Sequence, residues 1–303
     1  MKGVFYNMKG LAVVLFTGFL LAFTGVFARI LDQWYLPLQQ VILRDLIVFL
    51  FTLILIRPQK KEYLLWRENA LSPLAFGLAY ALTLLFFTLS ILNTSFLVSI
   101  SALYASSIIT SLIIERFRYG YALRFSDLLS ASLAILGIAF FALEGSSSGL
   151  NMGTIYGLLT GSFFSLANCL RKDMAMKIST VVIVRTQSGV GIVVYAFLNL
   201  VFGSWQVVNW QPLSLLFVIG YALTYLAIAV LLVWSFKIME FTKASLILSS
   251  ELIFAAILGL VIYGEIPTLF HGLGSVLIMG ACFIPQSVKG EDENKHICIY
   301  ENN

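Results

Sequence analysis

Two stretches of the chain decide its fold: SPLAFGLAYALTLLFFTLSI at residues 72–91 and LSLLFVIGYALTYLAIAVLLVWS at residues 213–235. Each is about as long as the roughly 20 mostly apolar residues that a helix needs to cross a bilayer. Both contain the tetrapeptide Tyr-Ala-Leu-Thr, which begins at Tyr80 and recurs at Tyr221. Two membrane-length segments that share this sequence indicate an internally duplicated membrane protein.

Composition extends this prediction to the whole chain. Of its 303 residues, 60% are hydrophobic and only 11% are charged, whereas soluble domains carry about 25% charged residues. Apolar runs of spanning length lie near 9–28, 37–56, 72–91, 95–114, 126–143, 152–170, 180–201, 213–235, 244–263 and 268–286. The predicted fold class is therefore an all-α polytopic membrane protein with ten transmembrane helices.

The basic residues test the number of crossings independently, because Lys and Arg accumulate in cytoplasmic loops. With the N-terminus inside, all basic residues but three fall on the cytoplasmic side. Arg29 falls outside, and Arg44 and Arg185 fall within helices. This asymmetry predicts a multi-pass protein of the cell (inner) membrane with both termini cytoplasmic. The chain has no soluble basic patch that would predict a nucleic-acid partner.

Further matches between the two halves follow a common order along the chain. Gly10, Thr17 and Gly18 match Gly153, Thr160 and Gly161 at a shift of 143, Arg44 matches Arg185 at 141, and Ser99 and Glu115 match Ser249 and Glu265 at 150. Because five crossings per half is an odd number, the second copy is predicted to be inverted in the membrane. The predicted organisation is two five-helix repeats, 1–143 and 152–286, followed by a disordered cytoplasmic tail at 287–303.

These marks resemble the drug/metabolite transporter superfamily, EamA type, over roughly residues 9–286. The resemblance rests on an Arg in the second helix of each half, a Glu closing the fourth helix of each half, and an acidic residue, Glu251, fourteen residues before the last of these. The Arg and Glu pairs are Arg44 with Arg185 and Glu115 with Glu265. We expect these four to act as gate or structural charges.

The chain departs from the family pattern at one feature of the fourth helices. Family members usually carry a Pro thirteen residues before the closing Glu, and here these positions are Ala102 and Leu252. Without Pro, any bend in these helices must come from serine clusters such as Ser106-Ser107 or Ser249-Ser250.

The resemblance implies a secondary transporter that works by alternating access. Its central cavity would be lined by the first, third and fourth helices of each half. On those helices the candidate substrate-binding residues are Glu251, Tyr80, Tyr104, Tyr221, Ser99, Ser249, Asn168 and Thr83. Tyrosines away from the membrane interfaces need a buried partner, whereas single hydroxyls can also satisfy backbone carbonyls of their own helix.

Glu251 is the strongest of these candidates. Its equivalent at the shift of 150 is Ser101, so the repeat alone does not require a carboxylate there. An acid at this depth relays a proton, binds a substrate ammonium or pairs with an intramembrane Arg, and the sequence leaves these alternatives open.

The missing charges narrow the substrate class. No Lys lies in the middle of a predicted span, which disfavours multiply charged phosphates. Tyrosine rings with one carboxylate favour amino acids or related amines, with a larger organic cation such as S-adenosylmethionine as the alternative. A channel or an intramembrane enzyme is the alternative of another class.

The sequence also limits the cofactors and partners. The chain has no nucleotide-binding G-x-x-x-x-G-K-[ST] loop. Its two His and three unpaired Cys do not have the spacing of a metal site. We therefore expect no cofactor, no metal and no enzymatic activity. The expected partners are a small-molecule substrate, the lipid bilayer and a coupling proton.

Overall fold

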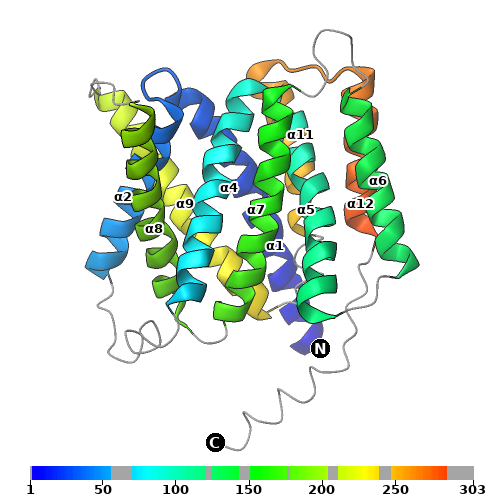
Figure 1. Ribbon diagram of the computed structural model, residues 1–303, viewed down its shortest axis with the longest axis horizontal. Helices are drawn as coiled ribbons and strands as arrows, with labels where there is room; N and C mark the ends of the chain where they lie inside the picture. The colour runs from blue at the N-terminus through cyan, green and yellow to red at the C-terminus, as the bar shows by residue number, and fades with distance from the viewer. Residues whose placement is uncertain are drawn as a thin grey trace, which may run out of the picture.

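The predicted helices are present in the fold. A computed structural model describes residues 2–55, 70–120, 124–142, 151–175, 178–203, 211–238 and 247–284. Within these residues the helices are α1 (Lys2–Leu31), α2 (Pro37–Leu55), α4 (Leu71–Asn93), α5 (Phe96–Tyr119), α6 (Phe125–Ala142), α7 (Met152–Ala175), α8 (Thr180–Phe202), α9 (Pro212–Ile238), α11 (Glu251–Tyr263) and α12 (Leu269–Phe283). Each predicted span overlaps one of these ten helices, so the all-helical polytopic fold is confirmed (Figure 1). The predicted tail at 287–303 lies outside the described residues.

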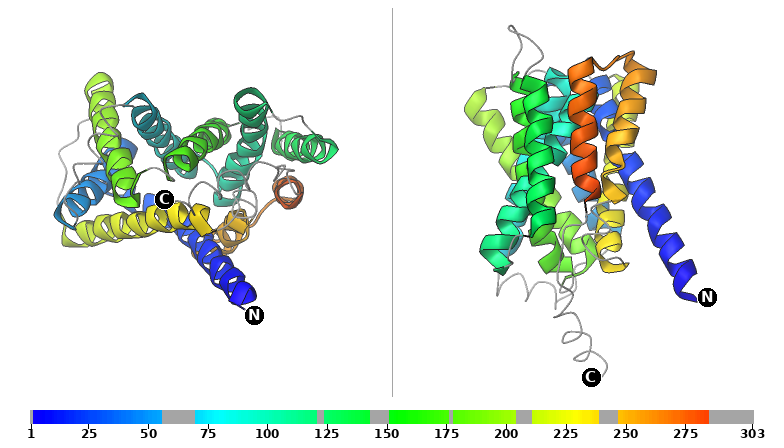
Figure 2. Two further views of the ribbon diagram at one scale, coloured as in Figure 1. Left: turned by 90° about the horizontal axis from the view of Figure 1, so that it is seen from below. Right: turned by 90° about the vertical axis from the view of Figure 1, so that its right-hand side faces the viewer.

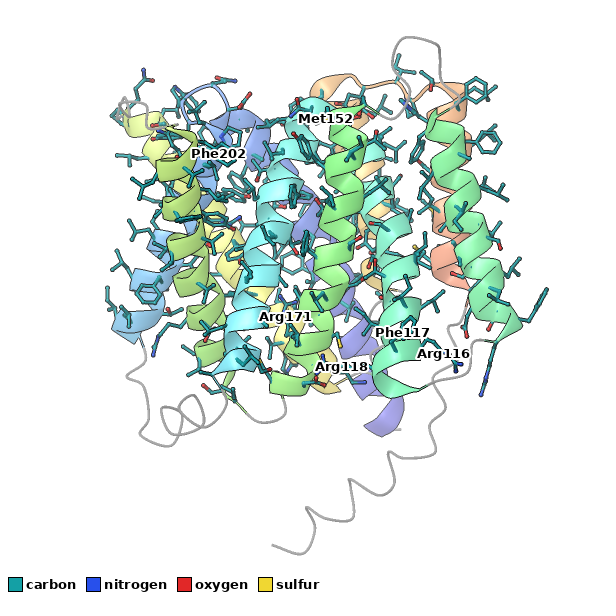
Figure 3. The ribbon with its side chains drawn as sticks, in the orientation of Figure 1. Arg116, Phe117, Arg118, Met152, Arg171 and Phe202 are labelled. Atoms are coloured by element: carbon teal, nitrogen blue, oxygen red, sulfur yellow. The ribbon has the colours of Figure 1, made fainter. Side chains whose placement is uncertain are left out.

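The outer surface of the helix bundle suits a membrane. Six described helices are long and apolar enough to cross a bilayer: α1, α2, α4, α5, α8 and α9. Shorter apolar helices lie in α6, α11 and α12. Large apolar side chains remain exposed on this surface, as at Met152 and Phe202 (Figure 3). Ile54, Val193 and Val261 are exposed as well. Such side chains are favourable in contact with lipid and costly in contact with water.

Helix α7 is the exception, because it is not among these apolar helices. It carries Thr154, Thr160, Ser165, Asn168 and Arg171, all of them buried. The helix packs mainly against α4 and α5 in the middle of the bundle (Figure 1). Protein surrounds its polar side chains, so this span does not need the apolar surface that a lipid-facing helix needs.

The helices form two sets of five, α1 to α6 and α7 to α12, and corresponding helices of the two sets make corresponding contacts. Helix α1 packs against α9 and α11, and α7 packs against α4 and α5. The second helices, α2 and α8, contact each other, as do the fifth helices, α6 and α12. Seen from below in Figure 2, the α6–α12 pair lies at one edge of the bundle, away from α2 and α8. This places the first, third and fourth helices of each set in the centre.

The sets also run in opposite directions. We call the end where α1 begins the lower end and the opposite end the upper end. Helix α7 begins at the upper end with Met152, and its Arg171 lies towards the lower end (Figure 3). The starting helices of the two sets are therefore antiparallel.

Two glycines make closely similar contacts in the two sets. A Cβ at Gly18 of α1 would lie 2.8 Å from Ser250 Oγ, and a Cβ at Gly161 of α7 would overlap Ser106 Oγ and the Leu103 carbonyl oxygen. The two serines are 144 residues apart, as are the left-handed C-caps Gly120 and Gly264. These contacts favour a register of 144 for the fourth helices in place of the predicted 150. Ser107 then takes the place of Ser101 as the counterpart of Glu251.

Candidate functional site

The helical path into α11 is interrupted next to Glu251. Ile247 and Leu248 are helical, Ser249 and Ser250 form a turn, and α11 begins at Glu251. At the turn the backbone bonds tighten to three-residue spacing, with Ser250 N to Ile247 O at 3.0 Å and Leu252 N to Ser249 O at 3.0 Å. A serine pair thus breaks the helix without proline.

The other serine pair proposed for a bend leaves its helix intact. Ser106 and Ser107 lie within the continuous helix α5. Ser106 Oγ bonds back to the Ala102 carbonyl oxygen at 3.1 Å, which is a common arrangement for serine inside a membrane helix. Of the two serine pairs, Ser249-Ser250 interrupts its helix and Ser106-Ser107 does not.

Tyr104 of α5 reaches across to this break. Its hydroxyl oxygen lies 2.8 Å from the Leu248 carbonyl oxygen and 2.8 Å from Glu251 Oε2. Both Tyr104 and Glu251 are buried. The carboxyl group therefore sits at the start of a helix, in contact with a phenol and shielded from solvent.

A cavity opens beside Glu251 in the centre of the bundle. Its lining comes from Leu21, Thr24, Arg44, Tyr80, Thr83, Leu84, Phe87, Leu103, Thr160, Phe164, Tyr221, Tyr225, Ile228 and Glu251. These residues belong to α1, α2, α4, α5, α7, α9 and α11. The cavity has about 40 Å³ of room for the centres of water molecules, which is space for a few waters. Four predicted binding residues, Tyr80, Thr83, Tyr221 and Glu251, line it.

Arg44 and Glu251 are the charged residues in this lining, and Arg44 is already paired. Its Nε and Nη2 donate to Asp45 Oδ1 at 3.0 and 2.8 Å, and its Nη1 donates to the Tyr221 hydroxyl at 3.1 Å. Its guanidinium also lies over the Tyr225 ring, 4.2 Å from the centroid. Arg44 and Asp45 together are neutral, so Glu251 carries the one unbalanced charge of the lining when it is ionised.

The other four predicted binding residues are not part of this lining: Tyr104, which contacts Glu251, and Ser99, Ser249 and Asn168. Ser99 Oγ donates to Ser90 Oγ at 2.7 Å, between α5 and α4. Ser249 hydrogen-bonds the Cys282 thiol, and Asn168 Oδ1 accepts from Arg171 Nη1 at 2.8 Å. Each of these groups serves contacts between or within helices, and their role as substrate contacts stays a prediction.

The four predicted gate or structural charges occupy different surroundings. Arg44 lines the cavity, and Arg185 Nη2 donates to the Thr52 carbonyl oxygen at 2.7 Å, which joins α8 to α2. Glu115, in the last turns of α5, interacts electrostatically with Asp127 and Lys172. Glu265 follows α11 at the upper end and forms an ion pair with Arg29.

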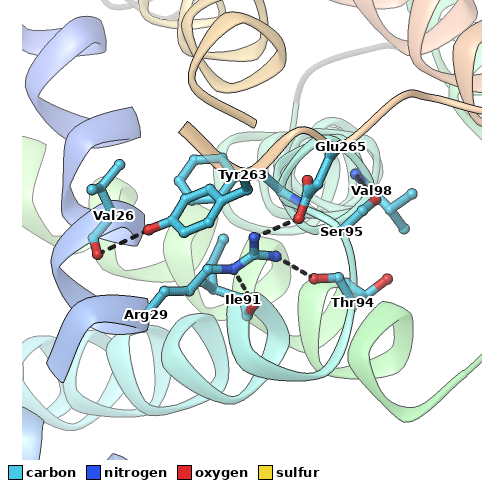
Figure 4. Close-up of polar contacts among 9 residues, drawn as sticks. Val26, Arg29, Ile91, Thr94, Ser95, Val98, Tyr263 and Glu265 are labelled. Carbon is cyan, nitrogen blue, oxygen red and sulfur yellow. Dashed lines mark hydrogen bonds and ion pairs between the residues drawn. The ribbon is translucent and has the colours of Figure 1, made fainter. Parts of the chain in front are cut away.

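Arg29 joins several elements at the upper end (Figure 4). Its guanidinium pairs with Glu265 and donates to the carbonyl oxygens of Ile91 at 3.0 Å and Thr94 at 2.8 Å. The other Glu265 oxygen accepts from the Phe96 backbone N–H at 2.7 Å. We call Arg29 and Glu265 with these partners the upper latch. It connects α1, the end of α4, the start of α5 and the segment after α11.

Comparison with known proteins assigns a family to the second set of helices. Residues 151–284 match the model of the EamA-like transporter family. This chain carries an EamA-like transporter domain. The matched range overlaps the second predicted repeat, 152–286. The EamA-like domain and the multi-pass fold together indicate a membrane transporter of small molecules.

The chain also matches solved structures. One, described only as "Crystal structure of protein", covers 91% of this chain and 96% of its own, with a TM-score of 0.56 and 15% sequence identity. At this identity the likeness shows the shared fold alone. A search of curated proteins finds no match for the chain.

Sequence reasoning missed two candidate residues. The sequence predicts Arg29 on the outer side but not its part in the upper latch, which it forms from the last turn of α1. The sequence also predicts Arg171 on the cytoplasmic side but not the complete burial of its side chain. One signal was available for Arg171: Asn168 lies three residues earlier on the same helical face, where it can accept a hydrogen bond.

Proposed function

We propose that this protein is a secondary transporter that carries an amino acid or a related amine by alternating access, with Glu251 as the central binding residue. The observation that carries the proposal is the position of Glu251. It lies at the end of a broken helix, in a central cavity where the other charge is already neutralised. Binding sites of secondary transporters typically form at such interruptions in membrane helices.

The cavity chemistry fits a substrate with one positive group. A substrate ammonium gains a counter-charge from Glu251, with the side chains of Tyr80, Tyr221 and Tyr225 in the same lining. Leucine, phenylalanine and isoleucine side chains make up much of the remaining wall, which suits an apolar side chain. The cavity's present volume favours a small substrate over an adenosyl cation, and either one requires the cavity to widen on binding.

Tyr104 has one hydroxyl hydrogen for two oxygen contacts, which supports a coupling proton on Glu251. A phenol has one hydrogen to donate, and the Leu248 carbonyl oxygen can only accept. The two contacts of 2.8 Å are both satisfied when Glu251 is protonated and donates to the Tyr104 oxygen. Release of this proton would create the charge that binds a substrate ammonium, which links substrate binding to proton movement.

The upper latch supplies a gate for alternating access. By the distribution of basic residues, the upper end faces the outside of the cell. In this conformation the latch joins both sets of helices above the cavity. Since Arg29 and Glu265 come from different sets, their separation would open the outer side.

We expect Arg29→Gln to open the outer side. A Cys placed at Thr24 in the cavity lining, in a chain whose three native Cys are Ser, reports on access through its reaction with a membrane-impermeant maleimide added outside intact cells. Loss of a charged hydrogen-bond network should speed labelling by at least about tenfold. Arg118→Gln is the matched control, because Arg118 pairs with Asp173 at the exposed lower end. An unchanged rate in the Arg29 variant would show that the latch does not close the cavity.

The proposed function is tested by a binding screen on the purified protein. The panel contains the twenty common amino acids, their decarboxylated amines, nucleosides and S-adenosylmethionine, and the readout is the melting temperature. A bound amino acid or amine stabilises the fold by about 2.7 kcal/mol at a hundred times its Kd, which gives a shift of several degrees. Stabilisation by S-adenosylmethionine alone would favour the larger organic cation. A panel without any shift would contradict both substrate classes.

A further inference from the structure

Arg171 is a fully buried guanidinium with unused donors. It lies in α7 with 0% exposure, and its Nη1 donates to Asn168 Oδ1 at 2.8 Å. Its Nε and Nη2 are buried without a hydrogen-bond partner. Among the residues that the structure describes, no carboxylate forms an ion pair with it.

This arrangement is costly unless a ligand completes it. A buried charge costs several kcal/mol when it is uncompensated, and buried polar groups in folded proteins are almost always paired. The rings of Phe76 and Tyr80, 5.5 and 4.9 Å from the guanidinium carbon, offset part of this cost but accept from neither free donor. The planar guanidinium presents Nε–H and Nη2–H groups side by side, the geometry that binds both oxygens of a carboxylate. Arg171 therefore offers two adjacent donors to an anion.

Arg171 lies directly behind the wall of the cavity. Its guanidinium carbon is 4.9 Å from the centroid of the Tyr80 ring, and Tyr80 lines the cavity. The Tyr80 ring in turn contacts Tyr225, which lies against Arg44. The two arginines thus flank a pair of tyrosines, and a movement of Tyr80 would connect Arg171 to the cavity.

Arg44 and Arg171 differ in how many of their hydrogen-bond donors are free. Arg44 uses its Nε, Nη1 and Nη2 on Asp45 and Tyr221, so a substrate carboxylate would have to displace Asp45. Arg171 has no such competitor in the described structure. The residue lies towards the lower end of the bundle (Figure 3).

We propose that Arg171 binds the carboxylate of the transported amino acid once Tyr80 moves aside, while Glu251 holds the ammonium. This inference rests on the proposed function, and it makes the substrate class an α-amino acid rather than an amine. The two groups are contributed by α7 and α11, and because the ammonium and carboxylate of an α-amino acid are bonded to one carbon, Arg171 and Glu251 would have to come close together when the substrate binds.

The test uses three probes with the same apolar group, chosen because the cavity wall is largely apolar. They are leucine, 3-methylbutylamine, which lacks the carboxylate, and 4-methylpentanoate, which lacks the ammonium. Affinities are measured by thermal shift and by calorimetry on the purified full-length protein. Arg171→Gln should weaken leucine and 4-methylpentanoate binding by roughly tenfold to a hundredfold and leave 3-methylbutylamine binding unchanged.

Two further variants keep the test decisive. Arg171→Met replaces the guanidinium by an apolar chain of similar length, and it provides the same comparison if the Gln variant does not fold. Arg118→Gln removes an exposed guanidinium from the lower end and should change none of the affinities. Equal leucine affinity in wild-type and Arg171 variants would overturn the inference while leaving the proposed function intact. The proposed function fails separately, if no amino acid or amine of the panel shifts the melting temperature, and 4-methylpentanoate still decides whether Arg171 binds a carboxylate.

Discussion

Glu251→Gln is expected to abolish transport while the protein still inserts and folds. Gln keeps the shape of the side chain and its hydrogen bond to Tyr104, so the broken segment before α11 should retain its contacts. It cannot ionise, so it provides neither a counter-charge for a substrate ammonium nor a site for a coupling proton. Loss of a buried charged interaction of about 3 kcal/mol reduces transport by roughly a hundredfold or more.

The measurement is initial uptake into proteoliposomes, together with the melting temperature of the purified variant. Asp173→Asn is the matched control, because it removes a carboxylate from the exposed pair with Arg118 at the lower end. That variant should transport at the wild-type rate. Undiminished transport by the Glu251 variant would remove this residue from the mechanism.

Gly161→Ala should strongly destabilise the helix bundle, although it adds only one methyl group. A Cβ at this position would overlap the Leu103 carbonyl oxygen and Ser106 Oγ of α5. Because a backbone carbonyl cannot rotate aside, α7 and α5 would have to move apart. Overpacking of this kind costs about 3 kcal/mol, which should appear as a markedly lower melting temperature in detergent and as reduced yield from the membrane.

Gly280→Ala provides the comparison for Gly161. A Cβ at Gly280 in α12 meets nothing within 4 Å, so this variant should be as stable as wild type or slightly more stable, because Ala favours the helix by about 1 kcal/mol over Gly. Equal melting temperatures for the two variants would mean that α7 and α5 do not approach as closely as the structure places them.

The helices could be predicted from the sequence because each span needs a continuous apolar run, and such runs are visible without knowledge of packing. The close approach of α1 and α7 to the fourth helices was also legible in part, since Gly18 and Gly161 recur in order. The register of the fourth helices was not. Chance identities, such as Ser99 with Ser249, suggested a shift of 150. The glycine contacts that make Ser106 equivalent to Ser250 are visible only in the structure.

The site was predicted only in part, because a sequence does not reveal which face of a helix points into the cavity. Tyr80 and Tyr221 line it, whereas Ser99 turns towards α4 and Asn168 towards Arg171. The polar residue types that join helices are the same types that bind a substrate. A second reason concerns arginine, whose long side chain can be buried although its position in the sequence suggests a loop. Arg171 was missed for this reason, and Arg29 was missed because its partner Glu265 is 236 residues away along the chain.

Counterflow in proteoliposomes tests the central claim most directly. Vesicles are loaded with a high concentration of the unlabelled amino acid that binds best and are then diluted into its labelled form at a low concentration. An alternating-access transporter exchanges the two across a closed membrane, so labelled substrate should accumulate transiently above its outside concentration, and Glu251→Gln should remove this accumulation. Equilibration without accumulation, or ionic conductance in its place, would contradict the account.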